Sequence, residues 1–174
     1  FERKDFDLTE TRMHWAVLDQ LSEPGRVLNE DGCGTAGRLA WILDGAVARG
    51  QSRFPQAGSD AAWLVRFVQD RLTEAAGHGG DSISAVLVEL ERAINKAYGT
   101  LPAGGQAVCP TTCLGLLKIT ERDGDRITVD AGIVADSVVL LDTGNGVLAW
   151  SDDRVKPFEE QAFAVLEMFP RIGD

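Results

Sequence analysis

Two acidic motifs near the start of the chain combine residue types that can do chemistry. Glu30-Asp31 precedes a glycine-rich stretch, and Asp44-Gly45 follows the almost wholly apolar run of residues 39–43. That run is typical of a strand buried on both faces, and a charge at the end of such a strand is costly unless it is paired or bound to a metal. Carboxylates, backbone carbonyls and water are the ligands that Mg²⁺ and Mn²⁺ favour. The motifs are therefore candidates for an ion pair or for a site that binds divalent cations.

Solvated turns are the other interpretation of the same motifs. An Asp-Gly pair after a strand is most often a turn, and Glu30-Asp31-Gly32 can form one as well. Arg26 lies four positions before the first acidic residue. Its guanidinium can bind an anion through two hydrogen bonds, although a single arginine is more often a surface residue.

The composition is that of one ordinary globular domain. The chain has 174 residues, of which 44% are hydrophobic and 25% are charged, and this length is enough for a sizeable core. It contains no apolar run long enough to span a membrane and no signal-peptide pattern. We therefore expect no membrane association. The three cysteines have no framework spacing, so we expect a cytoplasmic protein. A net charge of −10 without a lysine or arginine cluster disfavours nucleic-acid binding.

A hairpin is predicted to carry both acidic motifs. Residues 13–20 and 26–33 have strand patterns, and residues 39–44 are predicted to return antiparallel to the second strand through a turn at 35–38. The motifs would then flank one hairpin. Whether their side chains meet depends on its register.

Two helices are predicted after the hairpin. The first begins with Ser59 as its N-cap and ends at Gly77, and the second begins at residue 81 or 82 and ends at Gly99. Four strands are predicted next, at residues 111–120, 125–134, 137–142 and 146–151. A final helix is predicted at 158–168. This order favours an α+β fold with antiparallel sheets over a doubly wound parallel sheet.

Taken in order, the motifs resemble those of the metal-dependent protein phosphatases, the type 2C Ser/Thr phosphatases. That family shows an arginine four residues before an acidic pair, an apolar strand ending in Asp-Gly, two helices, a Gly-Ser/Thr-Thr strand and a strand ending in Gly-Asp-Ser. The corresponding stretches here are RVLNED at 26–31, ILDGA at 42–46, SDAAWLVRF at 59–67, PTTCLGLLKI at 110–119 and AGIVADSVVLLD at 131–142. The resemblance covers roughly residues 13–157.

The resemblance implies a fold, an activity and a set of site residues. The fold would be two antiparallel β-sheets packed as a sandwich flanked by helices, with residues 1–174 forming a single domain that lacks its C-terminal strands. The activity would be hydrolysis of phosphoserine or phosphothreonine in a phosphorylated protein by a metal-activated water. Two or three Mn or Mg ions would be held by Glu30, Asp31, Asp44, Gly45 and Asp136. Asp44 would bridge two ions, and Arg26 would bind the phosphate.

The chain departs from the family pattern in three places. Asp44-Gly45 is followed by Ala46 and not by the family's histidine, which is thought to act as the general acid. Ala135 replaces the glycine of Gly-Asp-Ser. The family's late metal-binding aspartates do not appear before the last residue of the chain. These departures leave a second hypothesis open, a catalytically impaired phosphatase-like module that binds and regulates a partner protein.

Overall fold

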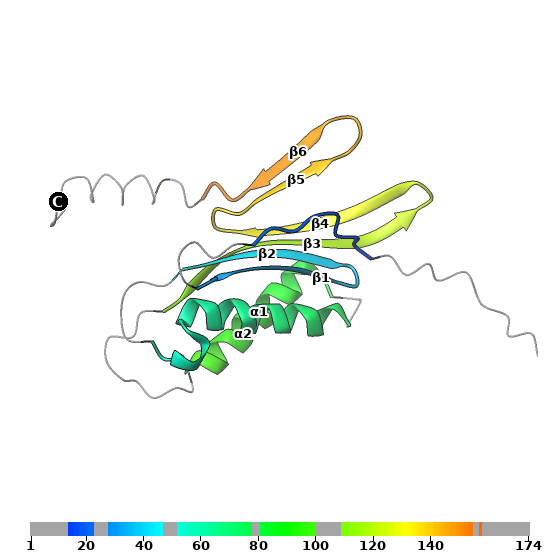
Figure 1. Cartoon of the computed structure of the whole chain (residues 1–174). Helices are drawn as coiled ribbons and strands as arrows, with labels where there is room; N and C mark the ends of the chain where they lie inside the picture. The colour runs from blue at the N-terminus through cyan, green and yellow to red at the C-terminus, as the bar shows by residue number, and fades with distance from the viewer. Residues whose placement is uncertain are drawn as a thin grey trace, which may run out of the picture.

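Two helices and six strands make up the part of the chain that the structure describes (Figure 1). The computed structural model describes residues 14–22, 28–46, 52–77, 81–99, 109–154 and 157. The strands are β1 (Asp31–Ala36), β2 (Leu39–Ala46), β3 (Thr111–Asp123), β4 (Arg126–Val134), β5 (Val138–Asp142) and β6 (Val147–Ser151). The helices are α1 (Asp60–Ala76) and α2 (Ile83–Gly99), and a 3₁₀ turn, η1 (Pro55–Ala57), precedes α1. Every strand pairing is antiparallel, so the predicted α+β class with antiparallel sheets is confirmed.

The strands form two sheets of unequal size. The larger has the order β1-β2-β3-β4, and the smaller is the β5–β6 hairpin. Both helices lie on one side of the larger sheet, and the hairpin lies on the other side (Figure 1). The hairpin approaches the sheet at Gly115 of β3, where an added Cβ would lie 3.6 Å from Cγ2 of Val139.

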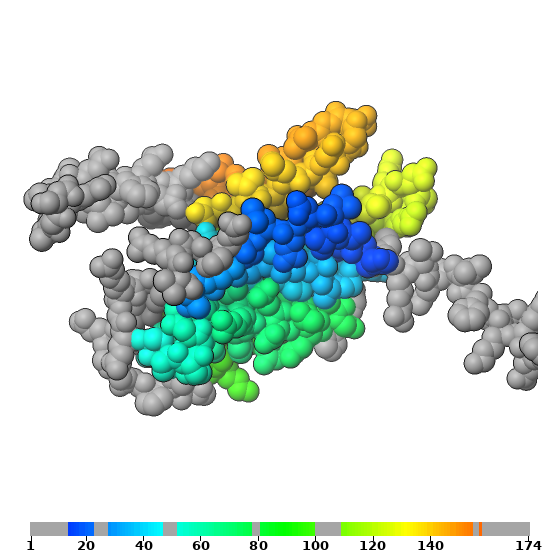
Figure 2. Space-filling view, in the orientation of Figure 1, coloured from blue at the N-terminus to red at the C-terminus, as the bar shows by residue number. Residues whose placement is uncertain are grey.

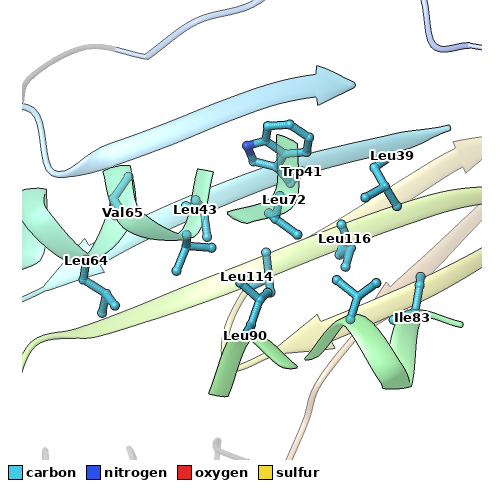
Figure 3. Close-up of a cluster of buried hydrophobic side chains, with 12 residues drawn as sticks. Leu39, Trp41, Leu43, Leu64, Val65, Leu72, Ile83, Leu90, Leu114 and Leu116 are labelled. Atoms are coloured by element: carbon cyan, nitrogen blue, oxygen red, sulfur yellow. The ribbon is translucent and has the colours of Figure 1, made fainter. Parts of the chain in front are cut away.

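The hydrophobic core lies between the larger sheet and the helices. Alternate residues of β2 and β3 point toward α1 and α2, as the two-residue period of a strand requires. They are Leu39, Trp41, Leu43, Leu114 and Leu116 (Figure 3). The prediction that residues 39–43 are buried on both faces is wrong, because Ile42 is 52% exposed on the opposite face. β2 is therefore a strand with one buried face.

Helix α1 begins and ends where the sequence predicts. The Ser59 hydroxyl accepts a hydrogen bond from the backbone N–H of Ala62 at 3.0 Å, and the helix ends before Gly77. The next residue, Asp60, is only 2% exposed and binds the preceding loop. Its carboxylate accepts hydrogen bonds from Ser52 Oγ at 2.6 Å and from the backbone N–H groups of Arg53 and Phe54 at 2.8 and 2.9 Å. The N-terminus of α1 thus fixes the chain that leads into it.

Two predicted strands differ from the structure. Residues 14–22 form no strand, and the predicted strand at 13–20 is wrong over its described part. The segment crosses the sheet on the side opposite the helices (Figure 2). It is attached through Trp15, whose Nε1 donates to the carbonyl of Arg38 at 2.8 Å, while Leu18 is 97% exposed. The strand predicted at 26–33 starts only at Asp31 in its described part.

The last predicted helix cannot be compared with the structure, whereas the membrane expectation can be compared over the described residues. The helix predicted at 158–168 lies outside the described residues. Within the residues that the structure describes, no helix is long and apolar enough to cross a membrane.

Candidate active site

The register of the β1–β2 hairpin places Asp31 directly opposite Asp44. Neighbouring residues of a strand point to opposite faces, and Gly45 faces helix α1, where an added Cβ would meet Val65. The Asp44 side chain therefore lies on the face away from the helices, and so does that of its partner. The carboxyl groups of Asp31 and Asp44 are close enough to share a hydrogen bond. The hairpin thus joins the two sequence motifs into one pair of carboxylates.

A third carboxylate adds to the negative charge around Asp44. Asp136 follows β4, at the same end of the sheet. Partial burial raises the pKa of Asp44 above its usual range, and the negative charges of Asp31 and Asp136 raise it further. Like charges held close together disfavour ionisation of one of them. This end of the sheet is therefore a place where a cation would be stabilised.

Cys113 holds the carboxylate of Asp136. It lies opposite Asp44 in the β2–β3 register, and its thiol donates a hydrogen bond to Asp136. Burial, this hydrogen bond and the neighbouring carboxylates raise the pKa of Cys113 to about 11. The thiol is therefore protonated at neutral pH and acts as a donor. Sequence reasoning missed this role, because it depends on the register of β3 against β4.

The turn that carries Asp136 depends on the backbone of Ala135 and on a hydrogen bond to Asp152. Ala135 adopts a φ of +64°, in the left-handed region that favours glycine; this is the position where the resembled family has glycine. Asp152, just after β6, accepts a hydrogen bond from the Ala135 backbone N–H. Hydrogen bonds from Arg154, the shorter at 2.6 Å, lower the pKa of Asp152 to about 2. Asp152 is thus ionised and ties the β4–β5 turn to the end of β6.

Glu30 lies apart from the carboxylate pair. Its side chain points toward the N-terminus of α1, where the Ser59 hydroxyl donates a hydrogen bond to Glu30 Oε1 at 2.5 Å. Its backbone carbonyl accepts a hydrogen bond from the N–H of Gly45 at 3.0 Å. A strand period of two already indicates that Glu30 and Asp31 face opposite sides. The structure accordingly brings Asp31, and not Glu30, next to Asp44.

Gly45 is required by close packing. An added Cβ would lie 2.4 Å from the Glu30 carbonyl oxygen and 2.8 Å from Cγ2 of Val65. Any other residue would push β2 away from the chain at residue 30 or from helix α1. The glycine of the Asp-Gly motif therefore has a structural reason in this chain, independent of metal binding.

The predicted ligand set is brought together only in part. Asp31, Asp44 and Asp136 gather at one end of the sheet, whereas Arg26 lies outside the described residues. Across the described ranges, no three Asp, Glu, His or Cys side chains are grouped closely enough to hold a metal ion by themselves. The oxygen donors nevertheless suit Mg²⁺ or Mn²⁺, because Mg²⁺ commonly binds through one or two carboxylates and completes its shell with water and substrate phosphate. Asp31 and Asp44 are such a pair.

Comparison with known proteins gives no match. No protein-family model, curated protein or solved structure is significantly similar to the chain.

Proposed function

We propose that the protein hydrolyses phosphoserine or phosphothreonine in proteins in a reaction that depends on Mn²⁺ or Mg²⁺. The observation that carries the proposal is the Asp31–Asp44 register, which pairs two carboxylates that come from separate motifs. Asp136 adds a third negative charge from a part of the chain far away in sequence. This agreement between the order of the motifs and the folded geometry favours a site over isolated turns.

The electrostatics of the site support a bound cation. Each charged neighbour that shifts the pKa of Asp44 among the described residues is negative, so a divalent cation would relieve the repulsion. When bound there, such an ion lowers the pKa of a water molecule and neutralises charge on the phosphate. Asp31 and Asp44 would hold it, Cys113 would keep the Asp136 carboxylate in place, and Arg26 would bind the phosphate.

The proposed family fold is more elaborate than the fold described above. It predicts a sandwich of two sheets with helices on both outer faces. The larger sheet and its two helices would form one sheet and one helical layer of that sandwich. The β5–β6 hairpin on the other face of the sheet would belong to the second sheet.

A regulatory module is the second candidate function. It is favoured by the incomplete grouping of metal-ligating side chains in the described parts of the chain and by Ala46 at the position of the family's histidine. Such a module would bind a partner protein without turning over a phosphate ester.

The deciding experiment measures hydrolysis of p-nitrophenyl phosphate in EDTA, Mg²⁺ and Mn²⁺. Its aryl leaving group departs without help from a general acid, so the missing histidine does not obscure the result. We expect turnover with Mn²⁺ and none in EDTA. Asp44→Asn should lower kcat/KM by more than about 100-fold, beyond the usual cost of losing an outer-shell partner.

Asp125→Asn is the matched control, because Asp125 lies in the β3–β4 turn at the opposite end of the sheet. It should leave turnover at the wild-type level. Full activity of Asp44→Asn would contradict the phosphatase proposal. Mn²⁺ binding without turnover in the wild type would favour the regulatory module.

A further inference from the structure

Residues 28–30 lie between strand β2 and the N-terminus of helix α1. Leu28 packs on Gly58, where an added Cβ would lie 3.0 Å from each of the two leucine methyl carbons. Two residues later, the Glu30 carboxylate accepts the hydrogen bond from Ser59, and the Glu30 carbonyl accepts the one from Gly45. Alternate side chains therefore fix this short segment to Gly58 and Ser59, directly before α1, and its backbone fixes it to β2.

The side chains of Asn29 and Asp31, which alternate with those of Leu28 and Glu30, point away from helix α1. Asn29 Oδ1 accepts a hydrogen bond from the backbone N–H of Asp31 at 2.9 Å, and Asn29 Nδ2 donates to Ser22 Oγ at 2.8 Å. Asp31 then enters β1 opposite Asp44. A shift of one residue would exchange the faces of Glu30 and Asp31, because the side-chain period of an extended chain is two.

Glu30 and Asp31 are adjacent carboxylates, so a one-residue shift would place Glu30 instead of Asp31 beside Asp44. Both have the chemistry of a metal ligand, and the hydrophobic pattern cannot distinguish them because both are acidic. What differs is the partner on the helix side. The Ser59 hydroxyl accepts the capping hydrogen bond from the Ala62 N–H and donates a hydrogen bond to the Glu30 carboxylate.

We propose that Ser59 is a positioning residue that selects Asp31 over Glu30 for the carboxylate site. The inference rests on the proposed function and assigns Glu30 a role in fixing the register. By holding Glu30 against α1, Ser59 keeps Asp31 on the opposite face, next to Asp44. Because the same hydroxyl also caps α1, it links the position of Glu30 to the N-terminus of the helix.

Four variants of the whole chain test this inference. Glu30→Gln removes the charge but keeps an oxygen that accepts from Ser59, and Asp31→Asn removes a charge from the site. Ser59→Ala removes the donor, whereas Ser59→Thr keeps it. The readouts are the Mn²⁺ dissociation constant by calorimetry, kcat and KM for p-nitrophenyl phosphate, and the unfolding midpoint in urea.

We expect Glu30→Gln and Ser59→Thr to bind Mn²⁺ with an affinity close to that of the wild type. Asp31→Asn should bind it much more weakly. Ser59→Ala should weaken Mn²⁺ binding by about tenfold, as is typical for loss of a group that orients a ligand. Its kcat with saturating Mn²⁺ should recover toward the wild-type value, because the site can still be filled.

Two results would overturn the inference while leaving the phosphatase intact. One is an active wild type in which Glu30→Gln weakens Mn²⁺ binding as much as Asp31→Asn does. The other is equal Mn²⁺ affinity in Ser59→Ala and Ser59→Thr, which would show that Ser59 only caps the helix. Mn²⁺ binding without turnover in the wild type would refute the phosphatase alone, and the affinities would still test the positioning role. A wild type that binds no Mn²⁺ would refute both.

Discussion

Asp44 is the residue at which stability and the proposed activity oppose each other. Burial and the charges of Asp31 and Asp136 raise its pKa, so the folded state disfavours the carboxylate that a metal would require. A raised pKa in the folded state means that stability is greatest below the aspartate's unfolded pKa and is lost as the pH rises through the folded value. The repulsion around Asp44 therefore grows as the pH rises through that value.

We expect Asp44→Asn to stabilise the metal-free protein at pH 7, because the neutral amide removes this repulsion. The gain should vanish below the ordinary aspartate pKa of 3.8, where both proteins carry a neutral side chain. Urea unfolding in EDTA at pH 7 and at acidic pH measures it. Added Mn²⁺ should reverse the order by stabilising only the wild type. A variant less stable than the wild type in EDTA would contradict this account.

The hairpin that pairs the two acidic motifs could be predicted from sequence. The contacts that individual side chains make around it could not. The apolar run before Asp44 and the turn near Gly37 indicate the hairpin, and the structure pairs Asp31 with Asp44. The same strand period would have separated Glu30 from Asp31. The contact of Cys113 with Asp136 could not be predicted, because it depends on the exact register of β3 against β4.

At the scale of elements, the N-terminus of α1 aligns two parts of the chain. Ser59 binds the segment before β1 through Glu30, and Asp60 binds the loop at 52–54. Burial by itself would raise the pKa of Asp60, but hydrogen bonds from Ser52, Arg53 and Phe54 outweigh it and hold that pKa below the usual value.

Asp60→Asn should destabilise the protein by about 1–3 kcal/mol at pH 7, because the buried donors of the loop lose a charged acceptor. A lowered pKa in the folded state gives stability that is present above the unfolded pKa and lost as the pH falls through the folded value. The difference between wild type and variant should therefore shrink in acid. Urea unfolding at pH 7 and pH 3 measures both effects.

Asp70→Asn is the control for Asp60→Asn, because Asp70 is an exposed aspartate on the same helix. Its effect should stay within about 0.5 kcal/mol at both pH values. Equal effects of the two substitutions would contradict the role assigned to Asp60.

The sequence predicted helices more accurately than the first strands. Ser59 and Gly77 mark the ends of α1 through local capping chemistry. Residues 13–20 have a strand-like composition, yet among the described residues Trp15 donates its hydrogen bonds to the carbonyls of Gly37 and Arg38 in the β1–β2 turn. A strand requires a partner strand, and local sequence carries no information about whether one is available.

At the scale of the whole molecule, the β5–β6 hairpin has one packed face and one open face. Val139 is 7% exposed and lies against the larger sheet, whereas its neighbour Leu140 is 67% exposed. The open side also carries Val138 and Val147. The two neighbouring residues therefore differ in environment while sharing the same strand.

Val139→Ala should cost about 2 kcal/mol of unfolding free energy, since it leaves a cavity between the hairpin and the larger sheet. Leu140→Ala should change that free energy by less than about 0.5 kcal/mol. It should also lower the fluorescence of a dye that binds exposed apolar surface. Chemical denaturation and dye titration of the two variants check the pair. Equal losses of stability would mean that both faces of the hairpin are buried.

The hairpin's small size determines how the molecule opens. β2 and β3 each pair with strands on both sides, whereas β5 and β6 pair only with each other in the described chain. A two-stranded hairpin is only marginally stable by itself in water. Its amide hydrogens should exchange with solvent well before those of β2 and β3, in an opening that leaves the Asp31–Asp44 pair intact. That opening would release the turn at Asp136. The rate at which the Asp136 carboxylate leaves and returns to the Asp31–Asp44 pair would then be the rate at which the hairpin opens and closes.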